Sequence, residues 1–170
     1  MEEYKGRLKI KYIFQKKIGF GVARNAAIAH VNTDLIATLD DDAVAREDWC
    51  QSIVNGHAQF PDVAAIQGRV YSTPKNSTIS LVEQLHIEKW FLKNMDINNN
   101  LNIISAKNSS FKLSLFKKLH LKFRDDPLIG LYGGEDKDIA FQIISKKQKI
   151  IYIPAIVVYH SERDSLAKYL

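Results

Sequence analysis

The sequence predicts an α/β layered fold with a mainly parallel sheet, built as one domain over residues 1–170. Short apolar runs that suit buried strands alternate along the chain with stretches in which apolar residues recur at helical spacing. A length of 170 residues fits a single hydrophobic core. With 46% hydrophobic and 25% charged residues, the composition is that of a globular protein rather than a disordered or fibrous one.

The expected strands are short apolar runs between polar stretches, and they cover residues 9–14, 35–39, 63–70, 103–106, 150–153 and 156–159. The expected helices cover residues 21–31, 47–60, 79–93, 113–119 and 136–145. Alanines, which are strong helix formers, dominate the first helix. In the third helix, Val82, Leu85 and Phe91 are expected to face inward.

Charge and cysteine content exclude several classes of protein. The formal net charge of +5 suits phosphates or an anionic surface, but the sequence has no arginine-rich run or nucleic-acid motif, so no nucleic-acid partner is expected. Cys50 is the single cysteine, which excludes an internal disulfide and a cysteine-rich zinc site.

Location is predicted from segments that the sequence lacks. No apolar run approaches the roughly 18 residues that span a bilayer, and residues 1–5 lack a signal-peptide pattern. A cytoplasmic protein is therefore expected. The basic cluster Lys146, Lys147 and Lys149 favours interaction with a helix dipole first, and peripheral contact with a membrane second.

An acidic triplet, Asp40-Asp41-Asp42, directly follows the apolar run 35–39. Side chains alternate along extended chain, so Asp40 and Asp42 should share a face while Asp41 points away. Ligands bind at the carboxyl ends of strands in open α/β sheets, and two close carboxylates suit a hard divalent cation. The alternative is a solvated loop in which Asp42 or Asp48 caps the next helix.

A second acidic segment, Gly134-Glu135-Asp136, leads into the last expected helix. Asp136 is a helix N-cap in the simpler interpretation. In the other, Glu135 or Asp136 is a general base beside a sugar hydroxyl. Two further candidates are Arg24, which opens the alanine-rich helix and suits a phosphate, and His160, which ends the last strand and matters only if it meets the acidic triplet.

Taken together, these segments resemble the family 2 glycosyltransferases, which have the GT-A fold. The motifs that carry the resemblance, in the family's order, are Gly19 to Ile28 with its Ala-Arg-Asn, Leu35 to Asp42 with its Asp-x-Asp, Asp48-Trp49, Lys107 to Phe111, Gly134 to Asp138 with its Glu-Asp, and Ile151 to His160.

The resemblance implies transfer of a sugar from a nucleoside diphosphate donor, with UDP favoured, to a hydroxyl of a saccharide or lipid-linked acceptor. It implies a Mn²⁺ or Mg²⁺ ion bound by Asp42, with Asp40 on the metal or the donor ribose and His160 as a further ligand. The implied donor-binding residues are Arg24, Asn25, Asp40 and Asp41. Asp136 would take the acceptor proton with Glu135 orienting the acceptor, and one base with direct attack implies inversion at the anomeric carbon.

The resemblance departs from the family at its N-terminal end. Family members usually begin with a strand and helix that hold the nucleotide base, and few residues precede Gly19 here. The expectation is therefore an N-terminally truncated GT-A domain whose sheet lacks strands, a state that favours self-association. A non-catalytic remnant is one alternative. Another is a haloacid-dehalogenase-like phosphohydrolase, whose Asp-x-Asp nucleophile motif Asp40 to Asp42 also resembles.

The loops that would select donor sugar and acceptor are 71–76 and 121–133. Their sequence does not identify either compound, because the fold alone does not fix the substrate.

Overall fold

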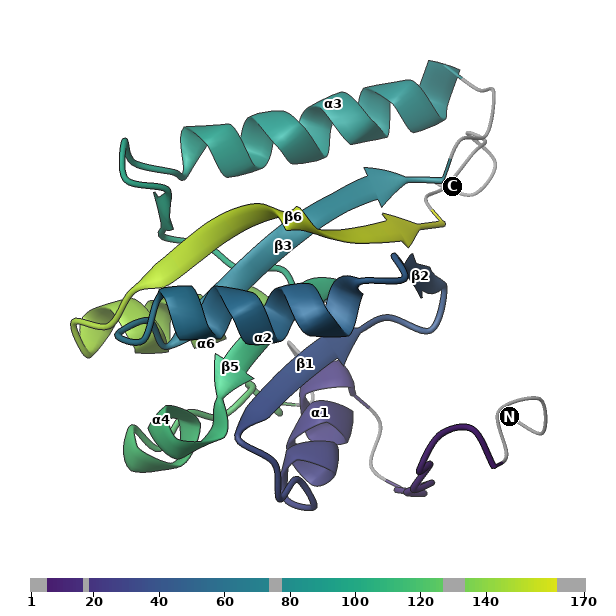
Figure 1. Cartoon of the computed structure of the whole chain (residues 1–170), viewed down its shortest axis with the longest axis vertical. Helices are drawn as coiled ribbons and strands as arrows, with labels where there is room; N and C mark the ends of the chain where they lie inside the picture. The colour runs from purple at the N-terminus through teal and green to yellow at the C-terminus, as the bar shows by residue number, and fades with distance from the viewer. Residues whose placement is uncertain (1–5, 17–18, 74–77, 127–133, 162–170) are drawn as a thin grey trace.

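The computed structural model describes residues 6–16, 19–73, 78–126 and 134–161 (Figure 1). The described helices are α1 (Phe20–Ile28), α2 (Trp49–Gln59), α3 (Thr78–Lys93), α4 (Leu113–Lys118) and α6 (Glu135–Ser145). The described strands are β1 (Leu35–Leu39), β2 (Ala43–Ala45), β3 (Ala65–Ser72), β4 (Asn100–Leu101), β5 (Asn108–Lys112) and β6 (Ile150–His160). Residues 74–77 and 127–133, in the two loops expected to select donor and acceptor, lie outside the described residues.

The described strands form one mixed sheet in the order β1-β5-β3-β6-β2, with β4 paired to β6 as well. β3 and β6 are parallel, whereas β5 lies antiparallel between β1 and β3. β1, β3 and β6 therefore run in one direction, and β2 and β4 each pair antiparallel to β6. The α/β fold predicted from the alternation of strands and helices is confirmed, with a mixed sheet.

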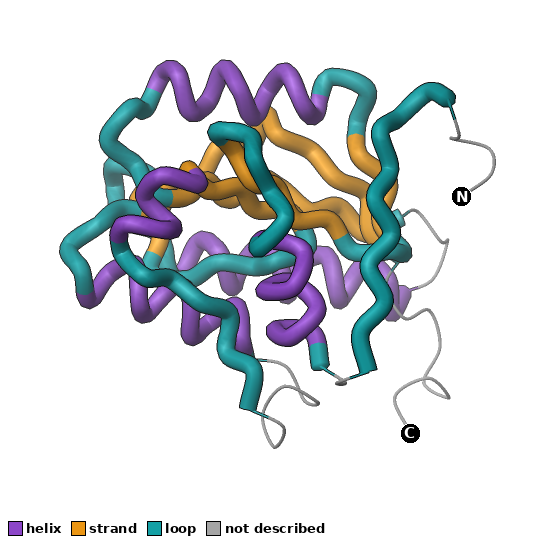
Figure 2. The backbone as a smooth tube through the Cα atoms, turned by 90° about the horizontal axis from the view of Figure 1, so that it is seen from below, coloured by secondary structure: helices purple, strands orange, loops and turns teal. Residues whose placement is uncertain are grey.

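Helices cover both faces of this sheet (Figure 2). On one face, α2 packs its Ile53 and Trp49 against Ile66 of β3 and Ile151 of β6. The larger core lies on the other face, where α6 contributes Ile139 to a cluster of buried side chains. No helix in the described part of the chain is long and apolar enough to cross a bilayer.

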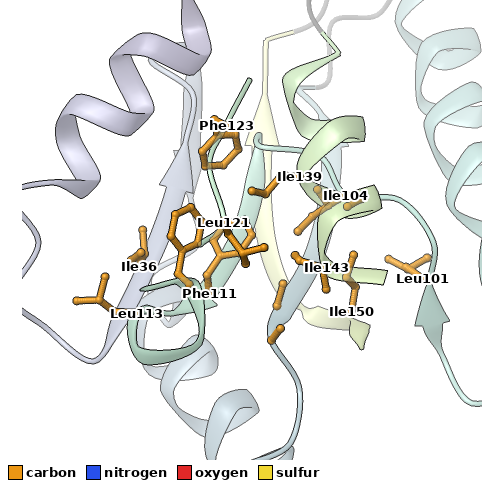
Figure 3. Close-up of a cluster of buried hydrophobic side chains, with 14 of the residues drawn as sticks. Ile36, Leu101, Ile104, Phe111, Leu113, Leu121, Phe123, Ile139, Ile143 and Ile150 are labelled. Atoms are coloured by element: carbon orange, nitrogen blue, oxygen red, sulfur yellow. The ribbon is translucent and has the colours of Figure 1, made fainter. Parts of the chain in front are cut away.

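Two aromatic rings, those of Phe111 and Phe123, pack among isoleucine and leucine side chains of the larger core (Figure 3). Phe111 of β5 meets Phe123 edge to face, with ring centroids 5.9 Å apart and planes at 87°. Both side chains are fully buried. This packing fixes the segment around Phe123 against the sheet, and α1 is attached to that same segment.

Three sequence predictions of secondary structure are wrong. Residues 9–14 contain no strand in the structure, and Tyr12 and Phe14 there are 69% and 73% exposed. Residues 103–106 form no strand either, because the Ser105 amide donates to Gln67 Oε1 (2.6 Å) instead of to a neighbouring strand. The two expected strands 150–153 and 156–159 are one continuous strand, β6.

The predicted inner face of α3 is correct only in part. Phe91 is buried at 4% exposure, as expected. Val82 and Leu85, also expected to face inward, are 59% and 56% exposed, so that prediction is wrong.

Candidate active site

The acidic triplet is brought to His160 by the tight turn between β1 and β2, two strands that lie at opposite edges of the sheet. β1 ends at Leu39, and the amide of Ala43 donates to the carbonyl oxygen of Asp40 (3.2 Å) in the turn that follows. β2 then pairs antiparallel with the end of β6, so that Ala43 lies opposite His160. The Ser161 amide donates to the carbonyl oxygen of Asp42 (3.0 Å), which holds the triplet beside the end of β6.

Asp40, Asp42 and His160 form a cluster at this edge. His160 Nε2 lies 3.0 Å from Asp42 Oδ1 and 3.6 Å from Asp40 Oδ2. One ligand atom from each of the three residues falls within 4.8 Å of the others. Asp41 is exposed and lies outside the cluster; residues 41–42 form a turn rather than the extended chain that the sequence analysis assumed. His160 therefore meets the acidic triplet, which is the condition under which it was expected to take part in a metal site.

These three residues fit a divalent cation. Two carboxylates and an imidazole offer hard oxygen ligands and one nitrogen ligand, a set that accommodates Mn²⁺ or Mg²⁺. The side chain of His160 is 8% exposed and that of Asp42 is 51% exposed, so the cluster has a fixed inner wall and an open outer side. A diphosphate could reach a cation there from the open side.

Helix capping does not explain the triplet. Asp42 is separated from α2 by β2, and the N-cap of α2 is Asp48. The Asp48 side chain makes no hydrogen bond to the helix amides. It accepts from Arg46 Nε instead (2.6 Å). The capping alternative is thus wrong for Asp42. Asp48 does occupy the N-cap position of α2, but its side chain does not cap the helix.

Arg24 links the metal-type cluster to the second acidic segment. It lies on α1, which begins at Phe20 after Gly19, and its guanidinium is bonded to both Glu135 Oε1 and Asp40 Oδ1, the latter at 3.4 Å. The guanidinium also lies over the rings of Phe20 and Phe123, at 5.7 Å and 5.5 Å from their centroids. An arginine held by two carboxylates and two rings is a fixed positive charge between the two acidic groups.

The second acidic segment begins α6. Gly134 adopts φ 102°, a left-handed conformation that favours glycine, and the helix starts at Glu135. The N-cap is therefore Gly134, and the N-cap interpretation of Asp136 is wrong. Asp136 stands in the first turn, where burial, and secondly the neighbouring Glu135, raise the pKa of its carboxyl group. Glu135 is buried at 5% exposure, and its Oε2 makes no hydrogen bond within the described residues.

A small cavity of about 180 Å³ joins the two acidic groups. Its lining includes Asp40, Arg24, Glu135, Asp136 and Lys107. A hydrogen bond with His160, and then the positive charges of Arg24 and Lys107, hold the pKa of Asp40 below its usual value. The Asp40 carboxyl group is therefore ionised at neutral pH. One wall of the cavity thus carries a charged carboxylate next to a possible cation site. The other carries a carboxylate whose proton affinity is raised.

Lys107 is a site residue that the sequence analysis did not single out. The antiparallel register of β1 and β5 ends where Leu39 lies opposite Asn108, so the residues just beyond it, Asp40 and Lys107, come to the same end of the two strands, where both line the cavity. This placement depends on β5 running antiparallel to β1. The sequence analysis expected a strand at residues 103–106 instead of β5, so it did not predict the position of Lys107.

Asn108 fixes the end of β6 that carries His160. Its Nδ2 donates to the carbonyl oxygens of Arg69 (2.8 Å) and Ile156 (2.9 Å), and its Oδ1 accepts from Trp49 Nε1 (2.9 Å). The register between β3 and β6 shifts at this point, from Gly68 opposite Ile153 to Arg69 opposite Val157. The buried amide satisfies backbone groups at this β-bulge and so sets where His160 emerges.

The structure does not bring Asn25 to the cluster. Its side-chain amide donates to the carbonyl oxygen of Phe123 (2.7 Å) and accepts from the Phe123 amide (3.0 Å). Asn25 therefore attaches α1 to the core segment, which positions its neighbour Arg24. Donor-binding roles for Asn25 and Asp41 remain predictions.

Comparison with known proteins identifies the family. The family model described as "Glycosyl transferase family 2" matches residues 1–120. The chain belongs to glycosyl transferase family 2. This membership confirms the predicted resemblance and overturns the haloacid-dehalogenase-like alternative.

A curated family relative and two solved structures are similar to the chain. Chondroitin synthase of Pasteurella multocida is 25% identical over 194 residues, covering 95% of this chain and 20% of that protein. The structure of GalNAc-T7 with UDP, GalNAc and Mn²⁺ superposes with a TM-score of 0.65 at 13% identity, covering 95% of this chain and 33% of that one. Mannosyltransferase PcManGT from Pyrobaculum calidifontis, in complex with GDP-Man and Mn²⁺, gives 0.59 at 19% identity, covering 87% and 38%.

These matches show the GT-A fold, as the resemblance implied. The chain spans 20% of the length of the chondroitin synthase, 33% of the GalNAc-T7 chain and 38% of the PcManGT chain.

Proposed function

We propose that this family 2 chain carries the catalytic centre of a metal-dependent, inverting glycosyltransferase. The donor is a nucleoside diphosphate sugar, with UDP favoured, and the acceptor is a hydroxyl of a saccharide or lipid-linked saccharide. The observation that carries this proposal is the cavity that joins Asp40 of the cation-type cluster to Asp136. A donor diphosphate at the first group would place its sugar toward the second.

Asp42, Asp40 and His160 would hold a Mn²⁺ or Mg²⁺ ion, and the donor diphosphate would lie on the exposed side of Asp42. The bound ion would neutralise charge on the departing nucleoside diphosphate, as a Lewis acid does. Mn²⁺ in the solved complexes of GalNAc-T7 and PcManGT supports this choice of ion. The first complex holds UDP and the second GDP-Man, so the nucleobase of the donor has to be determined by experiment.

Two cations of the chain would face the donor phosphates. Arg24 is fixed by its pairs with Glu135 and Asp40, so its charge needs no reorganisation when the donor binds. Lys107 lines the same cavity. Charge-assisted hydrogen bonds from these groups to phosphate oxygens would stabilise the leaving group as its charge develops.

Asp136 would act as the general base. It would accept the proton of the acceptor hydroxyl while the hydroxyl oxygen attacks the anomeric carbon from the side opposite the leaving diphosphate, which inverts that centre. A raised pKa brings this carboxylate closer to working pH and makes it a better proton acceptor. Glu135, whose Oε2 lacks a hydrogen-bond partner within the described residues, would orient the acceptor.

The test compares Asp136→Asn with Asp138→Asn, a matched change on the same helix. Asp138 Oδ2 accepts from Gln142 Nε2 (2.5 Å) and Asp138 is absent from the cavity lining. Release of UDP from UDP-sugars is measured with Mn²⁺ and a panel of saccharide acceptors. Asp136→Asn should lower kcat by about 10²–10⁴-fold and leave UDP binding unchanged. Asp138→Asn should retain the rate.

A stability measurement separates catalysis from misfolding. The pKa of Asp136 is raised in the folded state, so its contribution to stability is present at low pH and is lost as pH rises through the folded pKa. Asp136→Asn should therefore raise the unfolding midpoint at neutral pH. A rate loss below tenfold, or equal losses in both variants, would remove Asp136 from the reaction. A wild-type chain that binds UDP and Mn²⁺ but transfers no sugar would support the non-catalytic remnant.

A further inference from the structure

α3 is an outer helix with a broad exposed face. Figure 1 shows it along one margin of the molecule, on the outer side of β3 and β6. Among the side chains of α3 that the structure describes, the exposed ones are Thr78, Leu81, Val82, Leu85, His86, Lys89, Leu92 and Lys93. At about 100° per residue these eight positions fall within an arc of roughly 140°. They form one continuous face, called here the outer face of α3.

The outer face is apolar although the helix already has an apolar inner side. Phe91 is buried, and Ile87 and Trp90 pack against the same core. On the outer face Leu81, Val82, Leu85 and Leu92 are 56% to 64% exposed. A helix that is apolar on both sides needs a second apolar environment. Four large side chains on one face also exceed the scattered exposure that is normal for a soluble surface.

The charged residues of the outer face are basic. They are Lys89 and Lys93, whereas the two carboxylates of the helix, Glu83 and Glu88, are only partly exposed. Glu88 accepts a hydrogen bond from Gln84 Nε2 (2.9 Å). The exposed charges that accompany the apolar side chains are thus of one sign.

The basic character continues past the end of the helix. Lys93 and Lys149 line the same groove between the end of α3 and the start of β6. The carboxylate in that groove is Asp96, whose Oδ1 accepts from the amides of Asn98 (2.8 Å) and Asn100 (2.9 Å). The turn after the helix also carries Ile97, which is 98% exposed. An apolar face that is bordered by lysines matches the interface of an anionic bilayer, where apolar side chains enter the acyl boundary and cations meet the headgroups.

We propose that the outer face of α3 docks the protein on an anionic membrane surface. Leu81, Leu85 and Leu92 would enter the interface, and Lys89 and Lys93 would contact lipid phosphates. A second copy of the chain fits this face less well, because the outer face offers no exposed carboxylate among its described residues to pair with the lysines of a copy. This docking surface is separate from the residues proposed for sugar transfer and does not depend on that function.

The test is co-sedimentation with vesicles of phosphatidylcholine alone and of phosphatidylcholine mixed with phosphatidylglycerol. The protein should bind the anionic vesicles and not the neutral ones, and 1 M salt should release it, because salt screens the lysine contribution. Lys89→Gln with Lys93→Gln should lower the partition coefficient by about 25-fold, at roughly fivefold per lysine.

The apolar contribution is tested by Leu85→Glu with Leu92→Glu, which should abolish binding. The matched control is Val54→Glu with Phe141→Glu, two changes at side chains that are 51% and 70% exposed on α2 and α6. This control should bind vesicles as the wild type does, and circular dichroism should show all variants folded.

Three results would overturn the proposal. One is a wild-type chain that stays in the supernatant with anionic vesicles. Another is equal loss of binding in the α3 variant and the control. The third is light scattering that shows a dimer in the wild type, dissolved by Leu85→Glu with Leu92→Glu, without vesicle binding. That result would assign the outer face of α3 to a second copy of the chain.

Discussion

Arg24 connects the two acidic groups of the site, and its replacement by methionine tests that connection. The substitution keeps a long apolar side chain against Phe20 and Phe123 while it removes the charge. Glu135, whose side chain is 6% exposed, would then keep a buried negative charge without its ion-pair partner. Removing one partner of a buried ion pair typically destabilises a protein by about 3–5 kcal/mol.

The structure sets the expected loss near the lower end of that range. The Arg24 side chain is 18% exposed, so some water already solvates the pair. Its contact with Asp40 is long (3.4 Å) and 28% exposed on the carboxylate side, which adds less than about 1 kcal/mol. We therefore expect a loss of about 3 kcal/mol in the free energy of unfolding. At about 2–4 °C per kcal/mol for a chain of this size, the midpoint should fall by about 6–12 °C.

The assay is urea unfolding followed by circular dichroism, as a double-mutant cycle with Glu135→Gln. Neutralising Glu135 removes the buried charge that Arg24→Met leaves unpaired, so the double variant should be more stable than the sum of the single losses predicts. A coupling energy of about 2 kcal/mol is expected for this pair. A loss below about 1 kcal/mol in Arg24→Met, or additive losses in the double variant, would refute the reasoning.

Substitutions at three further positions test other parts of the account. Burial lowers the pKa of His57 from 6.5 to about 4, so between those values the unfolded state takes up a proton that the folded state resists. The free energy of unfolding should therefore fall by about 3 kcal/mol as the pH is lowered from 7 to 4. In urea unfolding at these two pH values, His57→Asn should not show this loss. Gly68→Ala would place a methyl group against the Asn108 amide and the Ile156 carbonyl oxygen, and thermal unfolding should show a destabilisation of about 1–3 kcal/mol. Lys107→Met should weaken Mn²⁺-dependent UDP binding about tenfold or more in calorimetry, whereas Lys107→Arg should retain most of it; equal affinities would remove Lys107 from the donor site.

The parts of the fold that the sequence predicts well are those whose burial is apolar. The run Leu35–Leu39 is a strand at the predicted bounds, as expected for a short apolar run between polar stretches. β5 escaped prediction because its buried side chains include serines. Ser109 Oγ pairs with Thr38 Oγ1 (2.7 Å) and Ser110 Oγ with His57 Nε2 (3.0 Å), and a hydropathy pattern does not register such satisfied polar groups.

The candidate site was predictable where strand geometry alone decides it. Alternation along extended chain predicted that Asp40 and Asp42 lie close together, and the structure brings them together with His160, although a turn at residues 41–42 rather than extended chain does so. Lys107 was beyond reach because its position depends on the antiparallel register of β5. The N-cap interpretation of Asp136 failed because the left-handed conformation of Gly134 starts the helix one residue earlier than expected.

The exposed apolar face of α3 shows a different limit. Val82 and Leu85 were expected to face inward because apolar residues on a helix usually do. The helix has two apolar sides, and a sequence pattern gives no reason to choose between them. Packing against the core selects the side with Phe91 and Trp90.

Calorimetric titration of the purified chain with UDP, with and without Mn²⁺, tests the central claim most directly. Asp42→Asn removes a proposed cation ligand, and Asp34→Asn, at the opposite end of β1 from the triplet, is the matched control. The account predicts UDP binding that requires Mn²⁺, is lost in Asp42→Asn and persists in Asp34→Asn. A folded wild-type chain that binds UDP equally well without Mn²⁺, or binds no UDP at all, would contradict it.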